Sequence, residues 1–221
     1  MHMSVESGIG VLSTISGFLP VLAALINYKN LDKVLKIAAV YCLASVLSDI
    51  ALPLVVSAGS PNNYPVIHLY IAISILLLGA MYIYAFFNPL LKKAIFIIAA
   101  LTLAFAIANM IFMEGILDYP SISNTLLSIM VICFSLIYFY QLLTRQEFVH
   151  IEKQGLFWIN AGMLFYFAIN IFLFMLFKRI LHEHQEGFYV INNITNIIAN
   201  ILFTVGLLCK PQNQKVTSYQ Y

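Results

Sequence analysis

Residues 94–113 read AIFIIAALTLAFAIANMIFM, and this stretch decides the fold class. Only Thr102 and Asn109 within it are polar, and Lys92, Lys93 and Glu114 stand at its two ends. A helix of about 20 apolar residues crosses the hydrocarbon core of a bilayer, which is about 30 Å thick. The stretch therefore predicts a transmembrane helix.

Six other stretches have the same length and character, which gives seven predicted spans: Ile9–Asn27, Val34–Ser57, Val66–Phe87, Ala94–Met113, Thr125–Leu143, Leu156–Phe177 and Tyr189–Cys209. The breaks between them are short and carry the Asn, Gly and Pro residues of loops. We expect an all-α integral membrane protein, a seven-transmembrane-helix bundle that forms one domain over residues 1–209. Residues 210–221 are predicted to be a short, disordered cytoplasmic tail.

Composition supports the same class of protein. Of the 221 residues 62% are hydrophobic and 9% are charged, and the mean hydropathy is +0.93. A soluble domain carries about 25% charged residues, because water must solvate its surface. Lipid is therefore the expected solvent for most of this surface, and the net charge of +2, which is dispersed along the chain, argues against nucleic-acid binding.

The distribution of lysine and arginine predicts the orientation, since positively charged loops remain in the cytoplasm. With the N-terminus outside and the C-terminus in the cytoplasm, the outer segments hold two such residues, Lys178 and Arg179. The inner segments then hold nine: Lys29, Lys33, Lys36, Lys92, Lys93, Arg145, Lys153, Lys210 and Lys215.

Polar residues inside the spans fall into stripes. Cys42, Ser45 and Asp49 follow one another at i, i+3 and i+7 in the second span. Asn193, Asn196 and Asn200 in the last span lie on one face, within about 60° of arc at 100° per residue, with Asn192 beside them. Such faces are expected to point away from lipid.

Depth places these groups in one half of the bundle. Asp49 lies about 15 residues, or roughly 22 Å, from the inner end of its span. The other polar candidates lie in the outer halves of their spans, apart from Tyr166, which lies one helical turn from Asn170. We therefore predict an outward-facing polar pocket that takes a small-molecule ligand, with these candidates facing one another: Asp49, His68, Asn109, Tyr166, Asn170, Asn192, Asn193 and Asn196.

A second interpretation of the asparagines stays open. Asn, Ser and Thr side chains often join membrane helices by hydrogen bonds worth about 0.6–2 kcal/mol each. Asp49 differs, because a carboxylate in lipid requires a partner, a proton or water and is a functional candidate by default. Asp49 is predicted to be the single buried acid and the residue on which function depends.

The sequence lacks the motifs that are typical of several classes of enzyme. The sequence contains no zinc-binding His pair on a helix, no Gly-x-Ser-x-Gly turn and no glycine-rich phosphate loop. The run His182-Glu183-His184 is interpreted as part of a solvated loop rather than a metal site. We expect neither an enzyme nor a cofactor or metal requirement.

Several short motifs carry a resemblance to a known family: Phe157-Trp158-Ile159-Asn160-Ala161-Gly162, Tyr166-Phe167, Asn170-Ile171-Phe172, Ser48-Asp49-Ile50, His68-Leu69-Tyr70 and the pair Asn196 and Asn200. Together they resemble a family of short, uncharacterised bacterial seven-helix membrane proteins that often accompany sensor histidine kinases. The resemblance implies a place in the bacterial inner membrane and a signalling partner such as a histidine kinase. It implies no active site.

Two functions remain as hypotheses. The first is a receptor-like or sensory membrane protein that binds its ligand from outside and acts through a separate partner, since the chain has no output domain. The alternative is a small-solute or ion transporter or channel that uses Asp49. The two halves of the sequence do not repeat each other as many transporters do, and the inner half is apolar, which argues against transport.

Overall fold

A computed structural model describes residues 5–144, 151–182 and 187–210. These residues form helices and no strands: α1 (Val5–Asn27), α2 (Lys33–Ser57), α3 (Tyr64–Ala85), α4 (Pro89–Phe112), α5 (Ser121–Leu143), α6 (Gly155–His182) and α7 (Gly187–Leu208), with short 3-10 turns η1 (Tyr28–Asn30) and η2 (Ile151–Lys153). Each of the seven α-helices is long and apolar enough to cross a membrane. The prediction of an all-helical, multi-pass bundle is confirmed.

Side chains at the loops decide where helices begin. The Asp32 side chain accepts a hydrogen bond of 2.8 Å from the backbone N–H of Leu35, at the start of α2. Asn88 accepts one of 2.8 Å from Leu90, and Pro89 occupies the first turn, where its missing N–H costs nothing. Because of this cap, α4 begins at Pro89 rather than at the predicted Ala94.

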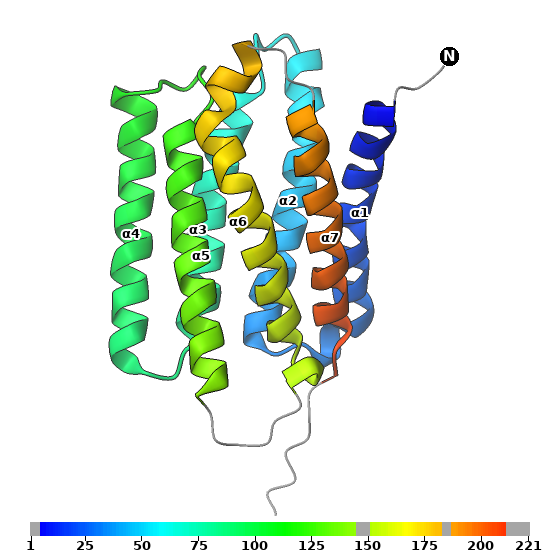
Figure 1. The fold of residues 1–221 in the computed structure, drawn as a ribbon, viewed down its shortest axis with the longest axis vertical. Coiled ribbons are helices and arrows are strands. Elements are labelled where there is room, and N and C mark those ends of the chain that lie inside the picture. Colours follow the sequence, from blue (N-terminus) through cyan, green and yellow to red (C-terminus); the bar gives the residue numbers. More distant parts are fainter. Residues whose placement is uncertain (1–4, 145–150, 183–186, 211–221) are drawn as a thin grey trace, which may run out of the picture.

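The helices form a closed ring in the order of the sequence. Each helix packs on the next, α7 closes the ring by packing on α1, and α3 also contacts α5. The described chain begins at one end of the bundle and finishes at the other (Figure 1). We name the end at which α1 begins the outer end, after the predicted orientation, and the opposite end the inner end.

Large apolar side chains cover the outside of the bundle. Ile26 and Phe112 are each 81% exposed, and similar residues surround the ring on every helix from α1 to α7. A water-soluble monomer rarely exposes contiguous apolar patches of more than a few hundred Å². The hydrocarbon of a membrane is the solvent that suits this surface.

The inner half of the bundle contains closely packed apolar side chains. Six apolar side chains there are at most 1% exposed: Leu78, Met81, Phe86, Phe134, Ile159 and Leu207. Tyr82 donates a hydrogen bond of 2.7 Å to Asn160 Oδ1 and lies 2.7 Å from Ser135 Oγ, while Asn160 Nδ2 donates to the Ser135 carbonyl at 3.1 Å. Because the Tyr82 proton goes to Asn160, the Ser135 hydroxyl donates to Tyr82, and this cluster of three residues from α3, α5 and α6 needs no water.

Two glycines let α6 and α7 approach closely at the inner end. A Cβ atom on Gly206 would lie 2.7 Å from the carbonyl oxygen of Gly155 and 3.0 Å from the Ile159 side chain. Real Cβ atoms do not approach a backbone oxygen so closely, so this crossing requires glycine.

We expect Gly206→Ala to lower the stability of the bundle by about 1–3 kcal/mol, because the new methyl group must push the two backbones apart. The measurement is the temperature at which purified protein in a maltoside detergent loses its monodisperse size-exclusion peak. Gly10→Ala is the matched control, since its Cβ would have no neighbour closer than 3.7 Å. A control variant that loses as much stability as Gly206→Ala would contradict the assignment.

Candidate ligand-binding site

Asp49 lies on the inward face of α2, on the same stripe as Cys42 and Ser45. Pro53 follows it by four residues and has no N–H, so the backbone carbonyl of Asp49 lacks its usual helical donor. The Asp49 carboxylate is half-buried, and it accepts no hydrogen bond from any residue that the structure describes. Asp49 therefore offers its carboxylate to a group from outside the fold.

A cavity of about 180 Å³ lies beside Asp49, and we call it the polar cavity. Five helices supply its wall, in which hydroxyl, amide and phenol groups predominate. Its lining residues are Ser13, Thr14, Tyr41, Cys42, Ser45, Asp49, Tyr70, Tyr166, Asn192, Asn193, Asn196, Ala199, Asn200 and Phe203. The polar cavity contains five of the eight predicted site residues: Asp49, Tyr166, Asn192, Asn193 and Asn196.

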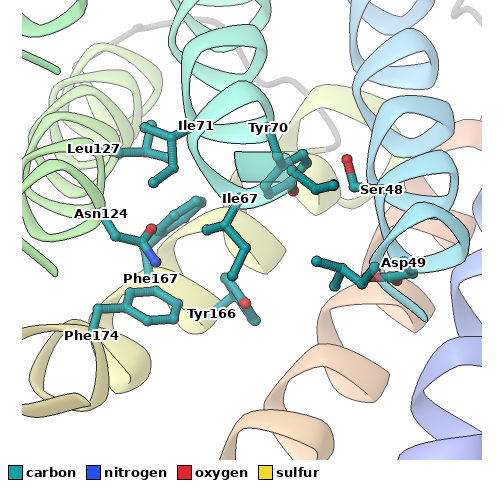
Figure 2. A pocket seen from close by; sticks show the side chains of 12 residues that line it. Ser48, Asp49, Ile67, Tyr70, Ile71, Asn124, Leu127, Tyr166, Phe167 and Phe174 are labelled. Atoms are coloured by element: carbon teal, nitrogen blue, oxygen red, sulfur yellow. The ribbon is translucent and has the colours of Figure 1, made fainter. Parts of the chain in front are cut away.

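A second cavity, of about 130 Å³, lies on the other side of the same residues, and we call it the apolar cavity. Its wall is mostly hydrocarbon: Ser48, Asp49, Leu52, Val66, Ile67, Tyr70, Ile71, Asn124, Leu127, Tyr166, Phe167 and Phe174. Figure 2 shows Ser48 and Asp49 on one side of it, Asn124 and Leu127 on the other, and Tyr70, Ile67 and Tyr166 between them. Asp49, Tyr70 and Tyr166 border both cavities.

Hydrogen bonds and ring contacts hold the aromatic wall in place. The Tyr70 hydroxyl donates to the Tyr41 hydroxyl at 3.2 Å, and the Tyr166 hydroxyl donates to Asn192 Oδ1 at 3.3 Å. The Tyr41 ring meets the Phe203 ring edge to face, with centroids 6.5 Å apart. These aromatic side chains come from α2, α3, α6 and α7, so the aromatic wall joins four helices.

The asparagines of α7 divide into two groups. Asn196 Nδ2 donates to Ser13 Oγ and Asn200 Nδ2 donates to Ser16 Oγ, both at 2.9 Å, so these two asparagines join α7 to α1. Asn193, by contrast, makes no hydrogen bond to another residue of the described ranges. Hydrogen bonds between helices thus account for Asn196 and Asn200, whereas the Asn193 amide remains available to a ligand in the polar cavity.

Asn170 is fully buried and borders neither cavity. Its Nδ2 atom donates to Thr195 Oγ1 at 2.7 Å and to the Tyr166 carbonyl at 2.8 Å. Asn170 therefore fixes α6 against α7 just behind the cavity wall. The expectation that its side chain faces Asp49 across the pocket is wrong.

His68 and Asn109 also lie away from the cavities around Asp49. His68 borders a separate cavity of about 270 Å³ between α3 and α4. Its Nε2 atom lies 3.1 Å from the carbonyl oxygens of both Gly115 and Asp118. Two carbonyl neighbours require a donor, so Nε2 carries the proton, and His68 anchors the loop between α4 and α5 rather than facing Asp49.

Glu114 is a second buried acid, only 7% exposed, so the prediction that Asp49 is the single one is wrong. Asn109 Nδ2 donates to its carboxylate and, at 2.9 Å, to Ser123 Oγ. The backbone N–H of Ile122 donates to Glu114 Oε1 at 3.3 Å. Glu114 follows the apolar stretch in the sequence, but the loop folds back and places its carboxylate between α4 and α5.

Aromatic residues connect the loop between α4 and α5 to the wall of the apolar cavity. Tyr119 stacks on Phe177 with ring centroids 3.8 Å apart, and the Tyr64 ring meets it edge to face at 5.8 Å. Burial raises the pKa of the Tyr119 hydroxyl, which therefore stays protonated while it accepts a hydrogen bond of 3.0 Å from Asn124. Asn124 in turn borders the apolar cavity.

Sequence reasoning missed Tyr41 and Tyr70 as site residues. A signal was present, because both tyrosines lie inside their spans, more than a turn from the helix ends where an interfacial belt is expected. The run His182-Glu183-His184 falls largely outside the described residues. Among the residues that are described, no group of three His, Cys, Asp or Glu side chains is placed to hold a metal ion.

Comparison with protein-family models, curated proteins and solved structures finds no match to this chain. The class that the fold and the cavities define is a seven-helix membrane protein with polar and apolar cavities on either side of one carboxylate.

The two buried acids should respond in opposite ways when their carboxylates are removed. We expect Glu114→Ala to lower the free energy of unfolding by about 1–3 kcal/mol, because Asn109 and the Ile122 N–H lose a buried acceptor. We expect Asp49→Leu to keep or raise stability, because an unpartnered carboxylate is costly to bury. Thermal unfolding of both variants in maltoside checks this, and a large loss of stability in Asp49→Leu would assign a structural role to Asp49.

Proposed function

We propose that the protein is a receptor-like sensory component of the bacterial inner membrane. It binds a small molecule from the outer side in the cavities around Asp49, and a separate partner protein, such as a sensor histidine kinase, responds to the bound state. The observation that carries the proposal is the pair of adjacent cavities that share Asp49, Tyr70 and Tyr166.

The position of Asp49 and of two asparagines beside it supports access from the outer side. Asp49 lies in the third quarter of α2, counted from Lys33, and Asn192 and Asn193 lie in the first two turns of α7. These positions all fall in the outer half of the bundle. With the N-terminus outside, as the lysine and arginine count predicts, the cavities face the outside of the cell.

The packed inner half favours binding over passage. On α2, α6 and α7, the residues nearer the inner end than the cavity wall include Ala38, Ile159 and Leu207, which are at most 1% exposed. Water and ions do not cross such a layer without large helix movements. A solute that reaches Asp49 from outside therefore leaves by the way it came.

Transport remains the second candidate, and the Asp49 carboxylate is the observation that favours it. An acid near the middle of a membrane is a common coupling group in transporters. Transport would require the packed inner half of the bundle to open, and uptake of a bound solute into proteoliposomes would replace the sensory proposal with this one.

Cysteine labelling tests both the pocket and its orientation. With Cys42, Cys133 and Cys209 replaced by Ser, we expect Asn193→Cys to react with a membrane-impermeant methanethiosulfonate in intact cells. Ile194→Cys is the matched control, because the neighbouring side chain is apolar, 43% exposed and absent from the polar cavity wall. Asn193→Cys should react at least tenfold faster, since thiols react in water and not in lipid.

Two results would count against the proposal. Equal, slow reaction at both positions would mean that water does not reach the cavity, and the binding function would fail. Reaction of Asn193→Cys only after the membrane is permeabilised would place the cavity on the cytoplasmic side, and the orientation would be wrong. Asn62→Cys, in the loop between α2 and α3, reports the orientation independently of the pocket.

A further inference from the structure

We propose that the ligand is a small organic ammonium ion, held by Asp49 and the aromatic side chains between the polar and apolar cavities. This inference rests on the proposed function and names the ligand class for the same site. The juxtaposition that points to it is one unpartnered carboxylate with Tyr41, Tyr70, Tyr166 and Phe203 around a cavity of about 180 Å³.

Charge gives the first argument. Among the described residues Asp49 is the only carboxylic acid in the wall of either cavity, and no Lys, Arg or His side chain borders them. The described lysines lie at or beyond the helix ends, and His68 donates to loop carbonyls elsewhere. A ligand with one positive charge would neutralise the carboxylate, whereas the carboxylate would repel an anion.

The aromatic wall gives the second argument, because it selects an organic cation over a metal ion. Ring faces attract ammonium groups, and cages of aromatic side chains are a recurrent way to bind quaternary or alkylated ammonium. Metal ions instead require several oxygen ligands in a tight shell. Aromatic rings from four helices around a single carboxylate resemble an aromatic cage for an ammonium group more than a metal site.

The lining and the volume of the two cavities indicate the polar part, the apolar part and the size of the ligand. On the polar side, Asn193 has no partner among the described residues and Thr14 and Ser45 present hydroxyl groups, so a hydroxyl or amide on the ligand would find hydrogen bonds there. On the apolar side, Leu52 and Phe174 accept only hydrocarbon. Both volumes fall below the roughly 300–1,000 Å³ typical of sites for drug-sized ligands, so the ammonium ion must be small.

Neutral compounds of the same shape provide a direct test. Purified protein in maltoside, free of phosphatidylcholine, is titrated with choline and with ethanolamine. Each is compared with an uncharged analogue in which carbon replaces the nitrogen, 3,3-dimethylbutan-1-ol and propan-1-ol. We expect at least one of the cations to bind saturably, by calorimetry and by a rise in unfolding temperature, at least tenfold more tightly than its neutral analogue.

Two carboxylate-to-amide variants locate the binding. Asp49→Asn should weaken binding of the cation at least tenfold while the protein still folds. Glu114→Gln, which makes the same change at the buried acid in the loop between α4 and α5, should leave the affinity unchanged. Loss of binding in Glu114→Gln and not in Asp49→Asn would overturn the site.

Other results separate failure of this inference from failure of the proposed function. No binding of either cation, or equal binding of the neutral analogues, would overturn the ammonium proposal. If Asn193→Cys is nevertheless labelled from outside, the receptor proposal stands with a different ligand class. An Asp49-dependent rise in unfolding temperature with sodium chloride, absent with the organic cations, would assign the site to a metal ion and also overturn the inference.

Discussion

Hydrocarbon offers no hydrogen-bond partner, and the arrangement of this bundle depends on that constraint. Polar groups inside it pair with one another: Tyr82 with Asn160, Asn170 with Thr195, and Asn196 with Ser13. Each pair joins two helices, so polarity in the spans acts mainly as a means of assembly. Asp49 and Asn193 stand out because the fold does not use their polar atoms within the described residues, and both border the same cavity.

The fold class could be predicted from the sequence because each transmembrane span can be recognised from its own residues alone. Lipid sets the length of an apolar helix, and residues 94–113 meet that length without reference to any neighbour. Boundaries were less accurate, since capping decides them: Asn88 and Pro89 start α4 one turn before the apolar stretch begins. The order of helices in the ring is not written in any one span, because it depends on which faces pack together.

The site could be predicted only in part, for a related reason. Helical spacing shows that Cys42, Ser45 and Asp49 share a face, and depth places Asp49 in the outer half. Neither property states which helix that face meets. His68 also lies in the outer half of its helix, yet it points toward the loop between α4 and α5. Glu114 could not be recognised as buried, because its burial depends on a loop that folds back against α5.

The two cavities lie between two groups of helices. Under the proposed function, this arrangement provides a route by which ligand binding would change the inner end of the bundle. One group contains α2 and α3, which carry Asp49 and Tyr70. The other group contains α6, α7 and α1. Gly155 and Gly206 let α6 and α7 pack closely. At the inner end, Asn27 of α1 donates hydrogen bonds to the carbonyls of Leu207 and Cys209.

If the proposed function holds, a ligand between Asp49 and Asn193 would contact both groups and would stabilise the arrangement in which they lie closer together at the outer end. The Tyr82–Ser135–Asn160 cluster joins α3 to α5 and α6 in the packed inner half, where the groups cannot separate easily. Closure at the outer end then requires rotation about this cluster, since packed helices move as rigid bodies. The inner ends of α2 and α7 would then shift, on the side where the proposed partner would detect the ligand.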